Sequence, residues 1–130
     1  DRTHPDLAAK VISPGRDFAN GDDDATDDHW HGTQVAGIAA ADSNNAEGIA
    51  GVARNCKILP VKVTAADGNG YYSWIIDGII WATDQGADVI NLSLGGDFDD
   101  PFLEDACKYA FDRGVVVVAA AGNDYGGPVV

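Results

Sequence analysis

The sequence predicts an α/β fold, because short apolar segments alternate with segments of helical periodicity from residue 54 onward. Residues 56–63, 88–94 and 115–121 are rich in apolar and β-branched side chains, as buried strands are. Strands that are apolar throughout and are separated by helices favour a parallel sheet with a helical layer on each face. We therefore expect three strands and two intervening helices in a three-layer arrangement, and 130 residues suit a single domain.

The first predicted strand and the helix after it have identifiable boundary residues. Pro60 cannot donate a hydrogen bond to a neighbouring strand, so we expect the strand at residues 56–63 to be irregular. Ser73 is suited to cap the amino terminus of the following helix, and Gly86 is suited to end it. The apolar face of this helix consists of Ile76, Ile79, Ile80 and Thr83.

Two further helices are indicated by residue spacing. One begins just after His31 and runs through Val35 and Ile38. The other lies between the last two strands and ends at Gly114; its apolar face consists of Leu103, Ala106, Cys107, Ala110 and Phe111. The first thirty residues show neither period, and we expect a long surface segment there, of the kind that is functional or held by a metal ion.

The charge balance excludes several classes of partner. Eight Lys and Arg against 21 Asp and Glu give a net charge of −13, which repels phosphate backbones and anionic lipid. We therefore expect neither nucleic acid nor a membrane as a partner. No signal-like segment opens the sequence, so we expect no localisation signal within these residues. Cys56 and Cys107 are too few for a disulfide scaffold, and we expect both thiols to be reduced.

Some motifs have competing interpretations. Residues 68–73 begin like a Gly-rich dinucleotide loop, but Ser73 stands in place of the third glycine, which favours a simple turn. His29 and His31 form an HxH pair, which is a weak zinc signal without a third spaced ligand. Five carboxylates within residues 22–28 favour either a solvated acidic loop or a hard cation with oxygen ligands.

Three segments together point to one family. They are HGTQVAG at residues 31–37, NLSLGG at 91–96 and AAAGN at 119–123, and shorter matches at 4–7 and 48–53 agree with them in order and spacing. With these motifs the sequence resembles the subtilisin-like serine proteases, or subtilases, and among them the thermitase and bacterial subtilisin branch. The resemblance covers nearly the whole chain. It implies the central part of the catalytic domain of a secreted serine endopeptidase, monomeric when full-length, that hydrolyses polypeptides.

The resemblance identifies His31 as the catalytic base and Asn123 as a hydrogen-bond donor of the oxyanion hole. An imidazole at a helix amino terminus feels the positive end of the helix dipole, which disfavours protonation and leaves it able to accept a proton. The resemblance also implies that the triad Asp lies before Asp1 and the triad Ser beyond Val130, so these residues alone are expected to be inactive. The alternative is a non-catalytic relative that binds calcium or peptide. No catalytic cofactor is expected.

The resemblance further implies that a peptide substrate adds to two exposed backbone edges. One edge consists of Asn69, Gly70 and Tyr71, and the other of Ser93, Leu94 and Gly95. The primary specificity pocket is lined by Leu94, Gly95, Ala120 and Gly122, and a more distant apolar pocket by Tyr72 and Ile75. Small and apolar walls favour a broad preference for hydrophobic residues.

Structural calcium is the cofactor that the resemblance implies, and the matching residues supply the oxygen ligands that a hard cation requires. The ligands of a tight site are the Asp6 carboxylate, the Asn45 side-chain oxygen and the carbonyl oxygens of Asp42, Glu47 and Ile49. A second, weaker site matches Asp17, Asp22, Asp24 and Thr26.

Overall fold

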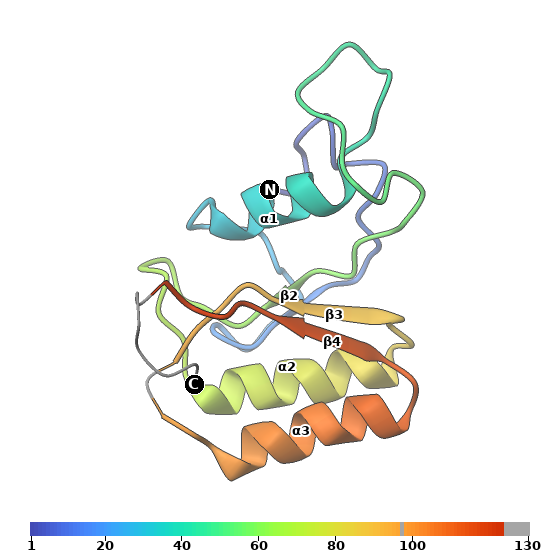
Figure 1. The fold of residues 1–130 in the computed structure, drawn as a ribbon. Helices are drawn as coiled ribbons and strands as arrows, with labels where there is room; N and C mark the ends of the chain where they lie inside the picture. The colour runs from blue at the N-terminus through green and yellow to red at the C-terminus, as the bar shows by residue number, and fades with distance from the viewer. Residues whose placement is uncertain (97, 124–130) are drawn as a thin grey trace. The chain divides into compact units, whose positions relative to one another are not determined.

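The computed structural model describes residues 1–96 and 98–123, and the chain divides into two compact units (Figure 1). The first unit is Asp1–Trp74 and the second is Ile75–Val130. Within the described residues, each unit contains one pair of parallel strands, which confirms a mixed α/β structure with parallel pairing. The assignment of all residues to a single domain stays a prediction.

The first unit contains strand β1 (Arg16–Asp17), helix α1 (His31–Ala40) and strand β2 (Val61–Lys62). The first thirty residues, expected to form a long surface segment, contain strand β1, which pairs in parallel with β2, and several of their side chains are buried. The strand predicted at residues 56–63 shortens to two residues. Pro60 explains this, since it lacks an N–H and contributes only its carbonyl oxygen, which accepts a hydrogen bond from the Arg16 N–H at 3.1 Å.

Helix α1 is fixed at its carboxyl end by the segment at residues 51–53. The N–H groups of Val52 and Ala53 donate to the carbonyl oxygens of Ile38 and Ala39 at 3.0 and 2.8 Å, which satisfies carbonyls that a helix end leaves unpaired. A Cβ at Gly51 would lie 2.3 Å from the Ala41 nitrogen, so this close approach requires glycine. The helix therefore has a defined position within the first unit.

The second unit contains most of helix α2 (Tyr72–Asp84), then strand β3 (Val89–Leu92), helix α3 (Pro101–Asp112) and strand β4 (Val116–Ala119). Strands β3 and β4 are parallel, with Val89 opposite Val116. The predicted succession of strand, helix and strand is thus confirmed. Helix α3 begins where Asp100 accepts hydrogen bonds from the N–H groups of Phe102 and Leu103. Ser73 lies inside α2, so its prediction as the N-cap is wrong by two residues.

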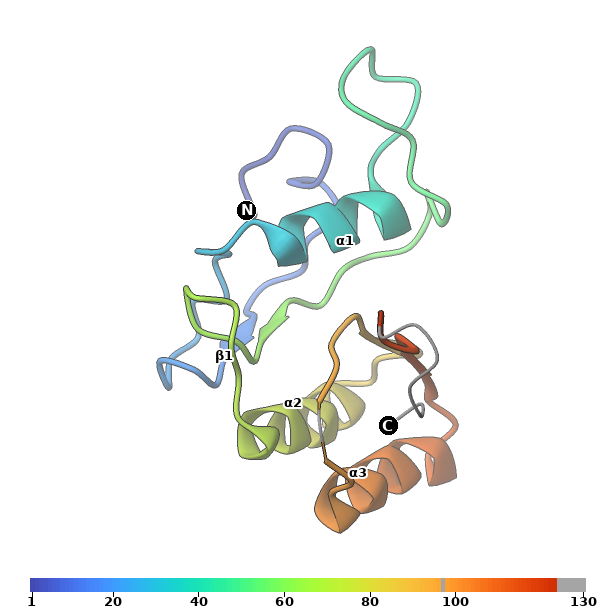
Figure 2. The same ribbon diagram turned by 60° about the vertical axis from the view of Figure 1, so that its left-hand side comes forward.

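Helices α2 and α3 lie on the same side of the β3–β4 pair (Figures 1 and 2). The core of this unit consists of residues from the helices and from the strand pair, each less than 9% exposed: Ile79, Ala82, Ile90, Ala106, Ala110 and Val115. On the other face of the pair, Val89, Val116 and Val118 are 57%, 55% and 48% exposed. Within the described residues, one face of this strand pair is therefore covered by helices, while the expected second helical layer stays a prediction.

Cys56 and Cys107 are both free thiols, and burial raises the pKa of the Cys107 thiol. Among the described residues, none of the helices combines the length and the apolar character needed to cross a membrane.

Candidate functional site

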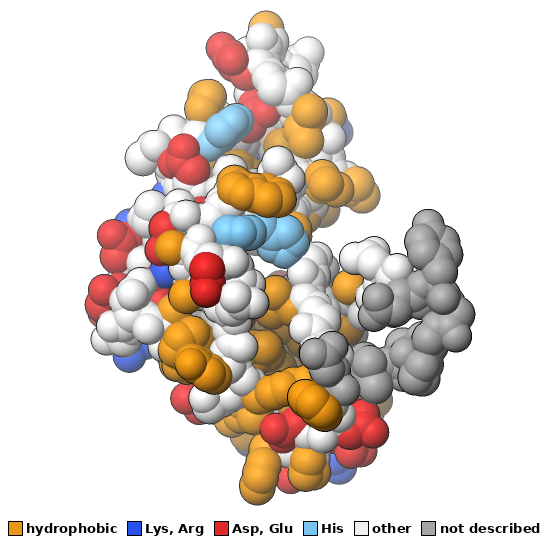
Figure 3. All heavy atoms as spheres, turned by 90° about the vertical axis from the view of Figure 1, so that its left-hand side faces the viewer, with side chains coloured by type: hydrophobic (Ala, Val, Ile, Leu, Met, Phe, Trp, Pro, Cys, Tyr) orange, Lys and Arg blue, Asp and Glu red, His pale blue; other side chains and the backbone are white. Residues whose placement is uncertain are grey.

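His31 is the first residue of α1 and is half-buried, as the sequence predicts to within one residue. The residue before it, Trp30, adopts a left-handed backbone conformation with φ 78°, and its side chain makes no capping hydrogen bond. The Trp30 indole stacks on the His29 ring at 5.0 Å and meets the His31 ring edge-on at 6.3 Å. In Figure 3, histidine side chains lie side by side on the surface next to hydrophobic ones.

Asp27 supplies the amino-terminal cap of α1 from outside the helix, a role that the sequence analysis missed. One carboxylate oxygen accepts from the N–H groups of His29 and Trp30, both at 2.9 Å. The other accepts from the N–H and the hydroxyl of Thr33 at 2.7 and 2.5 Å. Burial by itself raises the pKa of Asp27, but these hydrogen bonds outweigh it and lower the pKa to about 2. Asp27 is therefore ionised at neutral pH.

The turn before α1 lies against a loop that includes part of the predicted substrate edge. A Cβ at Gly68 would lie 2.8 Å from His29 Nε2, so the missing side chain leaves room for the imidazole. The loop is closed by a hydrogen bond from the Ala65 N–H to the Asn69 carbonyl oxygen at 2.7 Å. Asn69 and Gly70 are exposed, which leaves this segment accessible to a ligand.

The other predicted substrate residues, except Tyr72, lie in the second unit. Tyr72 begins α2 within the first unit, and Ile75 follows one turn later. The Ala120 N–H donates to the Leu92 carbonyl oxygen at 3.0 Å, which extends the β3–β4 ladder beyond β4. The carboxyl ends of both strands are thereby brought together, with the residues that follow them: Ser93, Leu94 and Gly95 after β3, and Ala120, Gly122 and Asn123 after β4.

Gly122, which follows β4, has a backbone conformation that favours glycine. Its φ is 81°, and a Cβ built there meets no atom within 4 Å, so conformation rather than space favours glycine. Asn123 follows directly and is exposed. Side chains beyond the carboxyl ends of parallel strands are well placed to contact a ligand.

Residues of the predicted tight calcium site come together in the first unit. The Asp6 carboxylate is 2% exposed, and it accepts from Asn45 Nδ2 at 2.8 Å and from the Ile49 N–H at 3.0 Å. These two hydrogen bonds lower the pKa of Asp6. A Cβ at Gly48 would lie 1.8 Å from Asp6 Oδ2, so the loop at residues 42–49 folds closely around this carboxylate.

The donor set at Asp6 fits a hard cation. The side-chain oxygen and nitrogen of Asn45 exchange places on rotation of the amide by half a turn, and the choice between them follows from the surroundings. An amide oxygen facing a carboxylate oxygen is repulsive unless a cation lies between them. The same loop carries the carbonyl groups of Asp42, Glu47 and Ile49, which are oxygen ligands of the kind that a hard cation requires.

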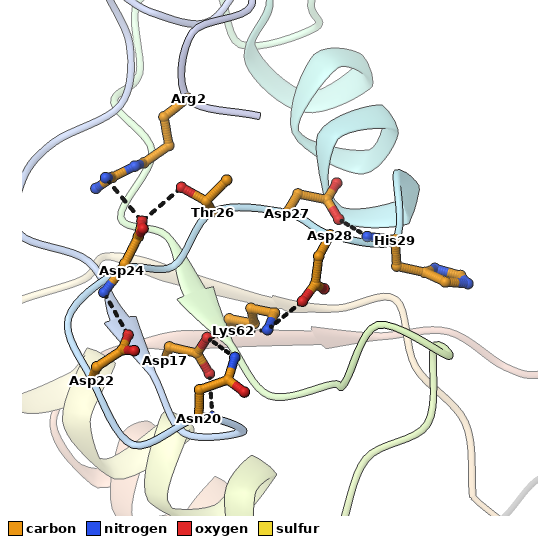
Figure 4. A network of polar contacts seen from close by, with 10 residues as sticks. All are labelled: Arg2, Asp17, Asn20, Asp22, Asp24, Thr26, Asp27, Asp28, His29 and Lys62. Atoms are coloured by element: carbon orange, nitrogen blue, oxygen red, sulfur yellow. Dashed lines mark hydrogen bonds and ion pairs between the residues drawn. The ribbon is translucent and has the colours of Figure 1, made fainter.

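The predicted second site has a different arrangement (Figure 4). Asp17 accepts hydrogen bonds from Asn20, whereas Asp22 Oδ1 accepts from the Asp24 N–H at 2.8 Å. The Asp24 carboxylate accepts from Arg2 at 3.1 Å and from the Thr26 hydroxyl at 2.6 Å. The three carboxylates thus have separate partners. Within residues 1–96 and 98–123, no group of three or more His, Cys, Asp or Glu side chains is arranged to hold a metal ion.

Lys62 supplies a positive charge to this acidic loop. Its ammonium group lies 3.1 Å from Asp17 Oδ2 and 3.0 Å from Asp28 Oδ2, and its side chain is only 8% exposed. Burial alone lowers the pKa of Lys62, but the two carboxylates outweigh this effect and raise it. The pKa of Asp17 is lowered, because its hydrogen bonds from Asn20 and Lys62 outweigh its burial. Lys62 therefore partly neutralises the loop.

The comparisons with known proteins agree with the motifs. A family model described as "Subtilase family" matches residues 1–129. The "Thermophilic serine proteinase" of Bacillus sp. (strain AK1) is 56% identical over 124 residues, 95% of this chain and 31% of that protein. "Thermitase" of Thermoactinomyces vulgaris is 50% identical over 120 residues, 92% of this chain and 43% of that protein.

A relative named "Major intracellular serine protease", from Bacillus subtilis (strain 168), is 47% identical over 129 residues, 95% of this chain and 40% of that protein. The solved structure of "Sphericase" matches with a TM-score of 0.86 and 38% identity, over 94% of this chain and 42% of that one. The chain thus spans less than half the length of the relatives it matches. On the family match over residues 1–129, this chain belongs to the subtilase family.

Proposed function

We propose that the full-length protein is a serine endopeptidase in which His31 is the general base of a Ser-His-Asp triad. The observation that carries this proposal is the position of His31 as the first residue of α1, held by the Asp27 cap, in a chain of the subtilase family. The chain covers 31–43% of the relatives named above, so the triad Ser and Asp are assigned to the rest of the protein.

In this proposal His31 transfers one proton during acylation, from the serine hydroxyl to the departing amine, and one during deacylation, from the attacking water to the serine oxygen. Its imidazole accepts the proton of the serine hydroxyl while that oxygen attacks the scissile carbonyl carbon, and it then donates the proton to the departing amine. The Asn123 amide donates a hydrogen bond to the carbonyl oxygen as negative charge develops there.

The substrate in this proposal is an extended polypeptide. Asn69 and Gly70 form one edge for main-chain hydrogen bonds, and Ser93, Leu94 and Gly95 form the other. Leu94, Gly95, Ala120 and Gly122 line the primary pocket, whereas Tyr72 and Ile75 shape a distant apolar pocket. The exposed positions of residues Asn69 and Gly70 and the joined carboxyl ends of β3 and β4 support these assignments.

The proposal predicts that the full-length protein hydrolyses casein and that phenylmethylsulfonyl fluoride abolishes the hydrolysis by modifying one serine. The modified serine is identified by mass spectrometry. Residues 1–130 alone serve as the control, and we expect no hydrolysis from them because a base without a nucleophile forms no acyl-enzyme. A full-length protein that binds peptide but neither cleaves it nor reacts would instead be a non-catalytic binding module.

Structural calcium belongs to the same proposal. Asp6, Asn45 and the carbonyl groups of Asp42, Glu47 and Ile49 would hold the ion, and the proximity of Asn45 and Ile49 to the buried Asp6 carboxylate supports this set. Bound calcium would supply the positive charge that offsets Asp6 and orders the loop. For the second set, Asp17, Asp22, Asp24 and Thr26, calcium would have to separate Asp24 from Arg2.

We expect millimolar calcium to raise the melting temperature of the full-length protein by about 5 °C over a chelated sample, because an ion that binds only the folded state stabilises it. Asp6→Ala should remove most of this difference. Asp23→Ala is the matched control, since Asp23 is exposed, pairs with Arg16 at 2.8 Å and belongs to neither proposed set of ligands. Equal melting curves with calcium and with chelator would contradict the tight site.

We further propose a monomer secreted from the cell, with the two strand pairs in one three-layer catalytic domain. The proposal of secretion rests on the family resemblance, whereas one relative is named an intracellular protease. Fractionation of cells that express the complete gene, followed by immunodetection in medium and lysate, distinguishes the two locations.

A further inference from the structure

One carboxylate, that of Asp27, collects four hydrogen bonds from the turn that leads into α1. Oδ1 accepts from the N–H groups of His29 and Trp30, and Oδ2 accepts from the N–H and hydroxyl of Thr33. The bonded groups lie on both sides of His31 in the sequence. They therefore fix the direction of the backbone at His31 while leaving its imidazole to other partners.

The turn contains a conformation that a bulky residue rarely adopts. Trp30 has φ 78° and ψ −30°, in the left-handed region that is costly for residues with a Cβ. Its indole is 62% exposed, so burial contributes little to holding it there. The Asp27 bonds to the N–H groups of Trp30 itself and of Thr33 bracket this residue and stabilise the conformation.

The turn is also confined on its other side. The His29 imidazole occupies the space above Gly68, where a Cβ would come within 2.8 Å of Nε2. Movement of the turn would therefore displace His29 against the loop at residues 65–69. Loss of the Asp27 carboxylate would release the turn on the Asp27 side only, and Trp30 would be free to leave its left-handed conformation.

From these contacts we propose that Asp27 is a positioning residue for His31. Its carboxylate sets the backbone from which the imidazole projects, so that Nε2 meets the serine hydroxyl at the right distance and angle. The proposal rests on the proposed function of His31 as the general base. Misplacement of a catalytic group by about 1 Å can cost about 100-fold in rate, which sets the scale of the expected effect.

The test measures kcat and KM of Asp27→Ala in the full-length protein, below the melting temperature of every variant. We expect kcat to fall by about tenfold to 100-fold with KM changed less than about twofold. Asp27→Asn should recover part of the loss, because its amide oxygen can still accept from the His29 and Trp30 N–H groups. Asp23→Ala, in the same acidic loop but paired with Arg16, should leave both constants unchanged.

A double-mutant cycle with His31→Ala separates positioning from general destabilisation. If Asp27 acts through His31, Asp27→Ala should cause no further loss in the His31→Ala background, whereas additive losses would overturn the proposal. Wild-type kcat for Asp27→Ala would also overturn it. Thr33→Val removes one donor and gives a milder test should Asp27→Ala not fold, with an expected loss of a few-fold in kcat. If His31→Ala itself keeps full activity, the proposed function fails rather than the role of Asp27.

Discussion

His31→Ala in the full-length protein should lower kcat/KM by about 10⁴-fold or more, the scale of losses at triads of this kind, with little change in melting temperature. The imidazole is the only part of the residue that the proposed chemistry uses. The Asp27 bonds that hold the start of α1 go to His29, Trp30 and Thr33, so the helix should form without the His31 side chain.

Peptide hydrolysis and circular dichroism melting of purified wild-type and variant proteins check this expectation. His29→Ala is the matched control, because it removes an imidazole two residues away and should leave kcat/KM within about tenfold of wild type. Near-normal hydrolysis by His31→Ala would contradict its assignment as the base.

Asn123→Ala should lower kcat by about 100-fold to 1,000-fold while KM changes little, because an oxyanion donor binds the transition state more strongly than the substrate. The exposed position of Asn123 directly after Gly122 makes loss of folding stability a minor effect. Steady-state kinetics on a chromogenic peptide measure both constants.

Two variants sharpen the test of Asn123. Asn123→Asp keeps the size of the side chain but replaces the donor by a negative charge, and it should be at least as damaging as alanine. Asn55→Ala changes an exposed asparagine in the first unit and should leave kcat unchanged. A rise in KM at constant kcat for Asn123→Ala would instead indicate a substrate-binding role.

The helices were predictable from sequence because their signals are local. Apolar spacing and glycine positions predicted α1, α2 and α3 near their observed bounds, and the error at Ser73 amounts to two residues at one helix end. The short pair β1 and β2 could not be predicted in the same way. Two residues in each strand are too few to show a period, and their pairing joins Arg16 to Val61 across 45 positions.

The residues of the candidate site also divide into those with a local sequence signal and those without one. The motif around His31 led to its proposed role as the base, and the motif before Asn123 led to its proposed role as the oxyanion donor, since both motifs consist of consecutive residues. Asp27 was missed because its cap acts over six positions through a turn with a left-handed Trp30, whereas the usual signal is a capping residue adjacent to the helix. An Asp followed six residues later by Thr was the only trace of it.

The sequence by itself determined the family and the α/β class, because these follow from residue order and local periodicity, and its motifs led to the proposed chemistry. Only the tertiary structure decided the partners of the acidic side chains. Asp6 is next to Asn45 and Ile49, Asp17 and Asp28 share the Lys62 ammonium, and Asp27 holds the start of α1. The energy of a carboxylate depends on charges and donors within a few ångströms, and up to 45 positions separate such neighbours in the chain.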